Sequence, residues 1–150
     1  VFKMFGDNIQ IGGSLTFTNN EDSLKWEKNG ALPNDRFETL KIMHDNGIRT
    51  WASMEPVIYP DQSLEIMELT SSYVDAYKIG KLNHFKKHEE KFDWTKFLTD
   101  SVDIMRKNNK EFYIKKDLLA FKEKDLYLSE NETNMDYLAI PNSRLKLELF

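Results

Sequence analysis

The feature that most constrains this chain is the alternation of strand-like segments with segments whose apolar residues fall on one helical face. Strands are expected at 9–18, 48–58, 73–80 and 111–119, and helices at 35–46, from Asp61 onward and from Trp94 onward. Such alternation is typical of repeated βα units, which build a parallel sheet. We therefore predict an α/β fold: a partial (βα) barrel of about four parallel strands alternating with helices.

The expected helices carry start and stop signals. Pro33 opens the first helix, and Gly47 ends it because glycine tolerates the left-handed conformation found after helix ends. Asp61 and Asp93 are expected to cap the second and third helices. The segment 19–30 is polar and is expected to be a loop.

Length limits how much of a barrel the chain can form. Its 150 residues predict a single domain, residues 1–150, whereas a closed barrel of eight βα units needs about 200 to 250 residues. The chain starts at Val1 without a methionine and ends in an apolar alternation, 144–150, that could form an edge strand. We expect a fragment that is incomplete on its N-terminal side, with open sheet edges covered by the missing half or by a second copy.

Composition excludes several kinds of site. The chain has no cysteine, which removes disulfides, cysteine nucleophiles and cysteine-bound clusters. We predict no metal ligands among its 3 histidines, and we assign no catalytic residue. No apolar run approaches the roughly 20 residues that a membrane span requires, and no signal segment opens the chain, so we expect a cytoplasmic protein.

Charge is distributed unevenly. The net charge is -4, yet residues 76–116 hold 11 basic and 6 acidic side chains. We interpret this stretch mainly as a solvated lysine-rich surface. A weak nucleic-acid-binding patch is the alternative.

Polar residues gather where three of the predicted strands end. Ser14 and Thr16 lie toward the end of the first strand, Glu55 toward the end of the second, and Lys81 and Asn83 just after the third. In a parallel sheet the carboxyl ends of the strands form the site, so we expect Ser14, Glu55 and Lys81 to open onto a common rim.

Glu55 is the sharpest case. It lies among apolar residues and needs a partner, for which Lys81 or Lys78 is the expected lysine. Either a structural ion pair or hydrogen bonding to a ligand would explain it. Gly12 and Gly13 lie inside the first strand, which indicates close approach to its backbone rather than a phosphate loop.

A family resemblance rests on one long run and a short one that follows it. These are GGSLTFTNNEDSLKWEKNGALPNDRFETLKIMHDNGIRTWASMEPVIYPDQSLEIM and VDAYKIGKLNH. They resemble the second half of the radical S-adenosylmethionine proteins related to spore photoproduct lyase, often labelled DNA repair photolyase. The resemblance covers roughly residues 8–120 and implies a partial barrel whose early strands are missing here.

The resemblance also implies a cofactor arrangement. Family members hold a [4Fe-4S] cluster on three cysteines after the first strand, and this cluster cleaves S-adenosylmethionine to a 5'-deoxyadenosyl radical. This chain lacks those cysteines. We therefore expect it to bind neither group alone and to be inactive alone.

By position, the resemblance places Ser14 and Thr16 on a cofactor-binding strand and Glu55 near the ribose or adenine. Lys81 and Asn83 would lie toward the substrate, and Glu27 and Arg36 would brace the loop after the first strand. Two alternatives remain open. One is a non-enzymatic half-barrel module that oligomerises through its sheet edges, and the other is a weak nucleic-acid-binding module.

Overall fold

The computed structural model describes residues 9–134, which form a four-stranded sheet of order β1-β2-β3-β4. The strands are β1 (Gln10–Ser14), β2 (Arg49–Met54), β3 (Ala76–Ile79) and β4 (Glu111–Ile114). All three neighbouring pairs are parallel. The predicted α/β class with four parallel strands is confirmed, and the open sheet is consistent with a partial (βα) barrel.

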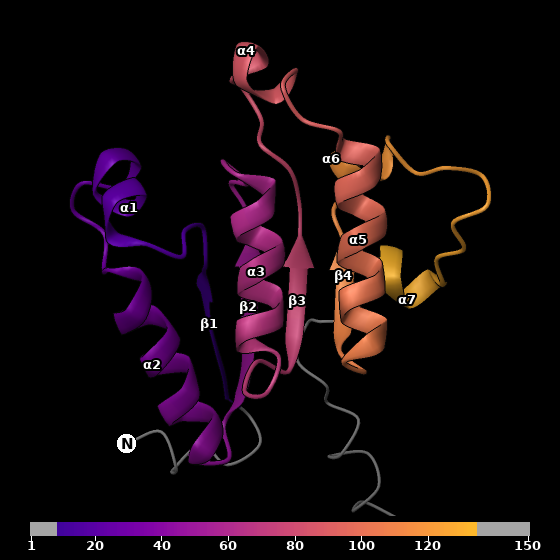
Figure 1. Cartoon of the computed structure of the whole chain (residues 1–150). Helices are drawn as coiled ribbons and strands as arrows, with labels where there is room; N and C mark the ends of the chain where they lie inside the picture. The colour runs from indigo at the N-terminus through magenta and orange to yellow at the C-terminus, as the bar shows by residue number, and fades with distance from the viewer. Residues whose placement is uncertain (1–8, 135–150) are drawn as a thin grey trace, which may run out of the picture.

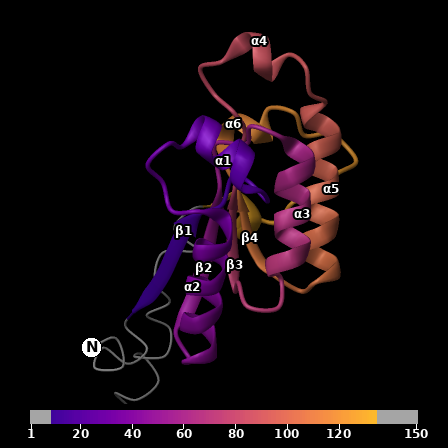
Figure 2. The ribbon, with the colours of Figure 1, turned by 60° about the vertical axis from the view of Figure 1, so that its left-hand side comes forward.

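Three long helices connect the strands: α2 (Pro33–Asp45), α3 (Pro60–Thr70) and α5 (Trp94–Lys107). All three lie on the same side of the sheet (Figures 1 and 2). Four shorter helices complete the described part: α1 (Asn20–Trp26), α4 (Lys86–Glu89), α6 (Lys116–Leu119) and α7 (Glu130–Thr133). Of these, α1, α4 and α6 lie at the end of the sheet toward which the strands point (Figure 1).

The core lies between the sheet and the three long helices. Along β2, Thr50, Ala52 and Met54 are buried, whereas the residues between them are partly exposed. The apolar stripe of α5 meets this face with Phe97, Leu98, Val102 and Met105, all at most 2% exposed. Burial of each large apolar side chain contributes about 1.5 to 3 kcal/mol, so this stripe holds α5 against the sheet.

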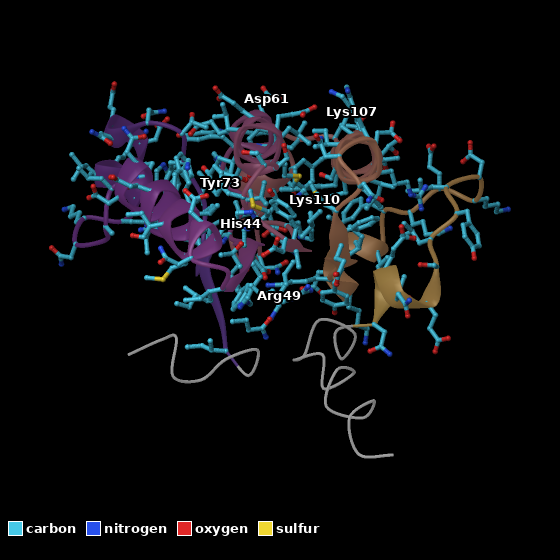
Figure 3. All side chains as sticks on the ribbon, turned by 90° about the horizontal axis from the view of Figure 1, so that it is seen from below. His44, Arg49, Asp61, Tyr73, Lys107 and Lys110 are labelled. Carbon is cyan, nitrogen blue, oxygen red and sulfur yellow. The ribbon has the colours of Figure 1, made fainter. Side chains whose placement is uncertain are left out.

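The opposite face of the sheet is different. No helix of the described residues lies over β1, β2 and β3 on that side, where Arg49 points away from α3 and α5 (Figure 3). Because side chains alternate along a strand, Trp51 and Ser53 share the face of Arg49. We call this side the open face. It comprises the side chains or α-carbons of Gly12, Ser14, Arg49, Trp51, Ser53, Ala76, Lys78, Glu111 and Tyr113.

Two helix signals are confirmed. Gly47 has φ 77° directly after α2, and Asp93 caps α5 by accepting a hydrogen bond from the Lys96 N–H at 2.9 Å.

The expected cap at Asp61 is wrong. The N-cap of α3 is Tyr59, which makes no side-chain cap hydrogen bond. Pro60, with its fixed φ, already occupies the first turn, so the helix starts before Asp61.

Other segment predictions are also wrong, and β1, β2 and β3 are all shorter than the predicted 9–18, 48–58 and 73–80. The polar stretch 19–30 contains α1, because the Asn19 side chain accepts a hydrogen bond from the Asp22 N–H and caps a helix there. The fourth strand was expected to reach Leu119, but it stops at Ile114. The chain then turns into α6, which buries Leu118.

The possible edge strand at 144–150 lies outside the described residues. Among residues 9–134, no helix has the length and apolar character needed to cross a bilayer.

Candidate functional site

The carboxyl ends of the four parallel strands meet at one edge of the sheet, and polar residues follow each of them. The register pairs Ser14 with Ser53, Ser53 with Lys78, and Lys78 with Tyr113. Two residues further along, Glu55, Gly80 and Lys115 therefore lie side by side on the next row. The Lys115 N–H donates to the Ile79 carbonyl at 2.8 Å, which holds that row in register.

Glu55 and Lys115 form an ion pair across Gly80. The Lys115 ammonium donates to Oε2 of Glu55, and both side chains are about three-quarters buried. A Cβ on Gly80 would lie 3.0 Å from Cδ of Glu55 and 3.1 Å from Cδ of Lys115. Because Gly80 has no side chain, Glu55 after β2 and Lys115 after β4 can reach each other across the end of β3.

Asn83 extends the pair into a small network. Its Nδ2 donates to Oε1 of Glu55 at 3.3 Å and to Oδ2 of Asp117 at 3.0 Å. Both oxygens of Glu55 thus accept a hydrogen bond or an ion-pair contact within the chain. Each carboxylate oxygen keeps a further lone pair that a ligand hydroxyl could use.

The expected pairing of Glu55 with Lys81 or Lys78 is wrong. Lys81 pairs with Glu89 at 2.8 Å and also donates to the Leu82 carbonyl at 2.8 Å. Lys81 lies two residues beyond the end of β3, and its ammonium contacts Glu89 and the Trp94 ring rather than Glu55. Ser14, Glu55 and Lys81 share the same edge of the sheet, but the Lys81 ammonium does not share the surroundings of Glu55.

Lys81 is held firmly on the helix side. It is 9% exposed, and its ammonium lies 5.6 Å from the ring centre of Trp94 and 5.9 Å from that of Phe121. The hydrogen bond from Lys81 lowers the pKa of Glu89 below the usual glutamate value. The Phe85 N–H donates to the other oxygen of Glu89 at 2.9 Å, which ties α4 to this lysine.

An open depression of about 460 Å³ lies next to this network. It is lined by Lys81, Asn83, His84, Lys116, Asp117, Ala120 and Phe121. His84 adopts a φ of 71°, which is uncommon for a residue other than glycine. The two residues predicted to face a substrate, Lys81 and Asn83, both contribute to this depression.

The two predicted cofactor residues of the first strand have different surroundings. Ser14 is exposed at the end of β1, whereas Thr16 is 2% exposed. The Thr16 hydroxyl has no hydrogen-bond partner within residues 9–134. Ser14 is therefore the more accessible of the two for a ligand.

Arg36 braces the end of β1. Its guanidinium donates to the Ser14 carbonyl at 3.0 Å and to the Ala31 carbonyl at 2.9 Å, and it forms an ion pair with Glu27 at 2.9 Å. The structural role expected of Glu27 and Arg36 agrees with these contacts.

An aromatic cluster joins α1 to α4. Both helices lie at the end of the sheet toward which the strands point (Figure 2). The His88 ring lies 5.7 Å from Trp26, 5.8 Å from Tyr59 and 5.2 Å from Phe92, measured between ring centres. A ring nitrogen of His88 is 2.8 Å from the Ile58 carbonyl. These contacts give His88 a packing role and hold the two short helices together.

The open face carries its own polar contacts. Arg49 forms an ion pair with Glu111 at 2.7 Å, and this pair spans β3 over the buried Ala76. A Cβ on Gly12 would come within 2.1 Å of the Trp51 ring, so that ring lies directly on the backbone of β1. The close approach expected at Gly12 is confirmed, whereas no atom comes within 4 Å of a Cβ built on Gly13.

Sequence reasoning missed Lys115 and Asp117 at the edge. Both were placed inside a longer fourth strand. The available signal was that the second strand also ends in an apolar residue followed at once by a charged one, Met54 followed by Glu55. The apolar strand ending at Ile114, followed by Lys115, repeats that pattern.

The residues present do not fit an iron–sulfur cluster, because this chain has no cysteine. Among the described residues, no group of three or more histidine, aspartate and glutamate side chains could hold a metal ion. The Ser14 hydroxyl and the Glu55 carboxylate do offer the hydrogen-bonding groups that a nucleoside requires.

Comparison of the chain with protein-family models, curated proteins and solved structures found no match. The family resemblance therefore rests on the sequence motifs alone.

Proposed function

We propose that this chain is the carboxy-terminal part of a radical S-adenosylmethionine enzyme similar to spore photoproduct lyase and the DNA repair photolyase-like proteins. In this proposal it supplies the later strands of the barrel, and a preceding segment supplies the early strands and the cluster-binding cysteines. The chain alone is inactive. A cytoplasmic location is part of the same proposal.

The observation that supports this most is the form of the sheet. Its four strands are parallel, its long helices cover one face, and its other face carries polar and charged side chains. The inward face of a (βα) barrel is likewise left uncovered by helices, because the helices form a ring around the outside of the barrel. The polar network of Glu55, Asn83 and Lys115 lies at the carboxyl edge, where barrel enzymes bind ligands.

The proposal gives each site residue a role. Ser14, Thr16 and Glu55 are the residues that would hold S-adenosylmethionine, which supplies radical chemistry when it is bound next to a reduced cluster. Glu55 would accept hydrogen bonds from a ribose or adenine, and the contacts from Lys115 and Asn83 keep its carboxylate in place. Lys81 and Asn83, at the depression near α6, would face the substrate.

The test begins with the reading frame that precedes Val1. We expect it to encode three cysteines in a CxxxCxxC arrangement. The preceding segment is then produced together with this chain. The complex should hold a coloured iron–sulfur cluster on these cysteines. On reduction in the presence of added S-adenosylmethionine, it should release 5'-deoxyadenosine.

A matched pair of variants then locates the cofactor. Glu55→Gln should raise the S-adenosylmethionine concentration needed for half-maximal cleavage, whereas Glu90→Gln, at the exposed residue directly after α4, should not. A preceding frame without the cysteines, or a complex that binds no cluster, would overturn the proposal.

The non-enzymatic alternative is favoured by a different observation. β1 pairs with one neighbour only within the described residues, so its outer edge can accept another strand, whereas α7 lies against β4 at the other edge. A second copy could cover the edge at β1. Light scattering over a range of concentrations tests this, since a chain that stays monomeric throughout contradicts pairing through the edges.

The nucleic-acid alternative has less support. Five of the basic side chains in 76–116 are in ion pairs with carboxylates, namely Lys81, Lys96, Arg106, Lys107 and Lys115. These pairs reduce the positive charge that the stretch can offer to phosphates. Binding that falls steeply with salt would support this alternative, and the absence of such binding would remove it.

A further inference from the structure

A row of polar side chains crosses the open face at a single level. Ser14, Ser53, Lys78 and Tyr113 are successive Cα partners on the four strands. All four side chains are at least partly exposed. Three hydroxyl groups and one ammonium therefore point from neighbouring strands to the same side of the sheet.

Lys78 differs from the other basic residues near it. Arg49 is paired with Glu111 at 2.7 Å, and Lys115 is paired with Glu55. Within residues 9–134 the Lys78 ammonium has no carboxylate partner and no hydrogen bond, and its close contact is the Trp51 ring, 4.0 Å from ammonium to ring centre. The open face thus carries one positive charge that no described carboxylate compensates.

The surroundings of Lys78 favour a bound anion. Burial lowers the pKa of the Lys78 ammonium, and repulsion from Lys115 lowers it further. The Trp51 ring favours the charged form and also fixes its position, because the ring rests on the backbone at Gly12. An oxyanion next to Lys78 would supply both the missing counter-charge and the missing hydrogen-bond acceptor.

We propose that Lys78, together with the hydroxyl groups of Ser53 and Tyr113, forms a binding site for an oxyanion, the carboxylate or phosphate group of a small ligand. The ammonium and the hydroxyls donate hydrogen bonds to the anion, and Trp51 holds the ammonium from the opposite side. This site lies on the open face and is separate from the Lys81 depression. It does not rest on the family proposed above.

The experiment follows the lysine side chains by NMR in the full chain labelled with ¹³C at the lysine Cε. Inorganic phosphate and acetate are the two probes, each added at constant ionic strength against chloride. We expect a saturable shift at the Lys78 resonance with one of them or both. A response to phosphate alone assigns the phosphate source, and a response to acetate alone assigns the carboxylate source.

Three variants distinguish specific anion binding at Lys78 from nonspecific attraction by the positive charges of the chain. Lys78→Met should weaken binding at least about tenfold, as expected for loss of a charge-assisted hydrogen bond, and Lys78→Arg should retain most of it. Lys41→Met, which removes an exposed lysine of α2, should leave binding unchanged. Because the wild-type titration reports Lys78 directly, the test does not depend on whether a variant folds.

Two results would overturn the proposal. One is a Lys78 resonance that shifts with neither probe, or shifts no more than the exposed lysines do. The other is a Lys78→Met chain that binds phosphate or acetate as tightly as the wild type.

Discussion

Glu55 and Lys115 lie 60 residues apart in the chain and form an ion pair at the carboxyl edge of the sheet. Their strands, β2 and β4, do not touch, because β3 lies between them. The pair meets across Gly80, where no side chain intervenes. The contact links the ends of three strands and fixes the carboxylate that we propose as a ligand group.

A double-mutant cycle with Glu55→Gln and Lys115→Met measures this link. Because both side chains are about three-quarters buried, we expect a coupling energy of about 1 kcal/mol in urea unfolding. The control is the exposed Lys41–Asp45 pair of α2, for which we expect at most about 0.5 kcal/mol. Equal coupling energies in the two cycles would contradict a buried contact between Glu55 and Lys115 across Gly80.

The contact between Gly12 and Trp51 predicts different outcomes at two adjacent glycines. Gly12→Ala places a Cβ where the Trp51 ring lies, so the ring must move, and we expect a loss of about 1 to 3 kcal/mol in the free energy of unfolding. Gly13→Ala meets no atom within 4 Å and should be neutral or stabilising by up to about 1 kcal/mol. Urea unfolding measures both. A Gly12→Ala chain as stable as the wild type would show that the contact between the Trp51 ring and the backbone of Gly12 does not stabilise the fold.

Glu89 should contribute to the pH dependence of stability. The hydrogen bond from Lys81 lowers the pKa of Glu89 in the folded chain. The interaction therefore stabilises the fold above the usual glutamate pKa, and this contribution is lost as the pH falls through the lower, folded value. Between about pH 6 and about pH 3, the free energy of unfolding should fall less steeply in Glu89→Gln than in the wild type.

Glu90→Gln is the matched control for that measurement. It removes the same charge at the neighbouring exposed position, which has no side-chain hydrogen bond or ion pair to the described residues. Its pH profile should follow that of the wild type. If Glu89→Gln also follows the wild type, the ion pair with Lys81 does not contribute.

The two aspartates near helix starts should differ in their effect on stability. Asp93 accepts a hydrogen bond from the Lys96 N–H, so Asp93→Ala should cost about 1 kcal/mol. Asp61 lies inside the first turn of α3 and makes no cap hydrogen bond, so Asp61→Ala should cost at most about 0.5 kcal/mol through the helix dipole. Thermal or urea unfolding compares them. A larger loss at Asp61 would contradict the cap assignment.

The sequence by itself determined the order of the secondary structure and the edge at which polar residues gather. Apolar periodicity located the three long helices and the four strands, and the βα alternation predicted that the strands are parallel. The cap at Asp93, the helix stop at Gly47 and the close approach at Gly12 were also readable, because each depends on local backbone geometry and on residue type. Where two local signals competed, as with Pro60 and Asp61, the prediction failed.

Only the tertiary structure decided which charged groups meet. Glu55 pairs with Lys115 rather than with Lys81, and Lys81 points to the helix side, where Glu89 and Trp94 surround it. Partner choice depends on the lateral register of neighbouring strands, and a shift of one residue moves a side chain to the other face. The apolar pattern along the chain locates the strands, but it does not specify that register. The unpaired ammonium of Lys78 over Trp51 likewise became visible only when four strands were aligned.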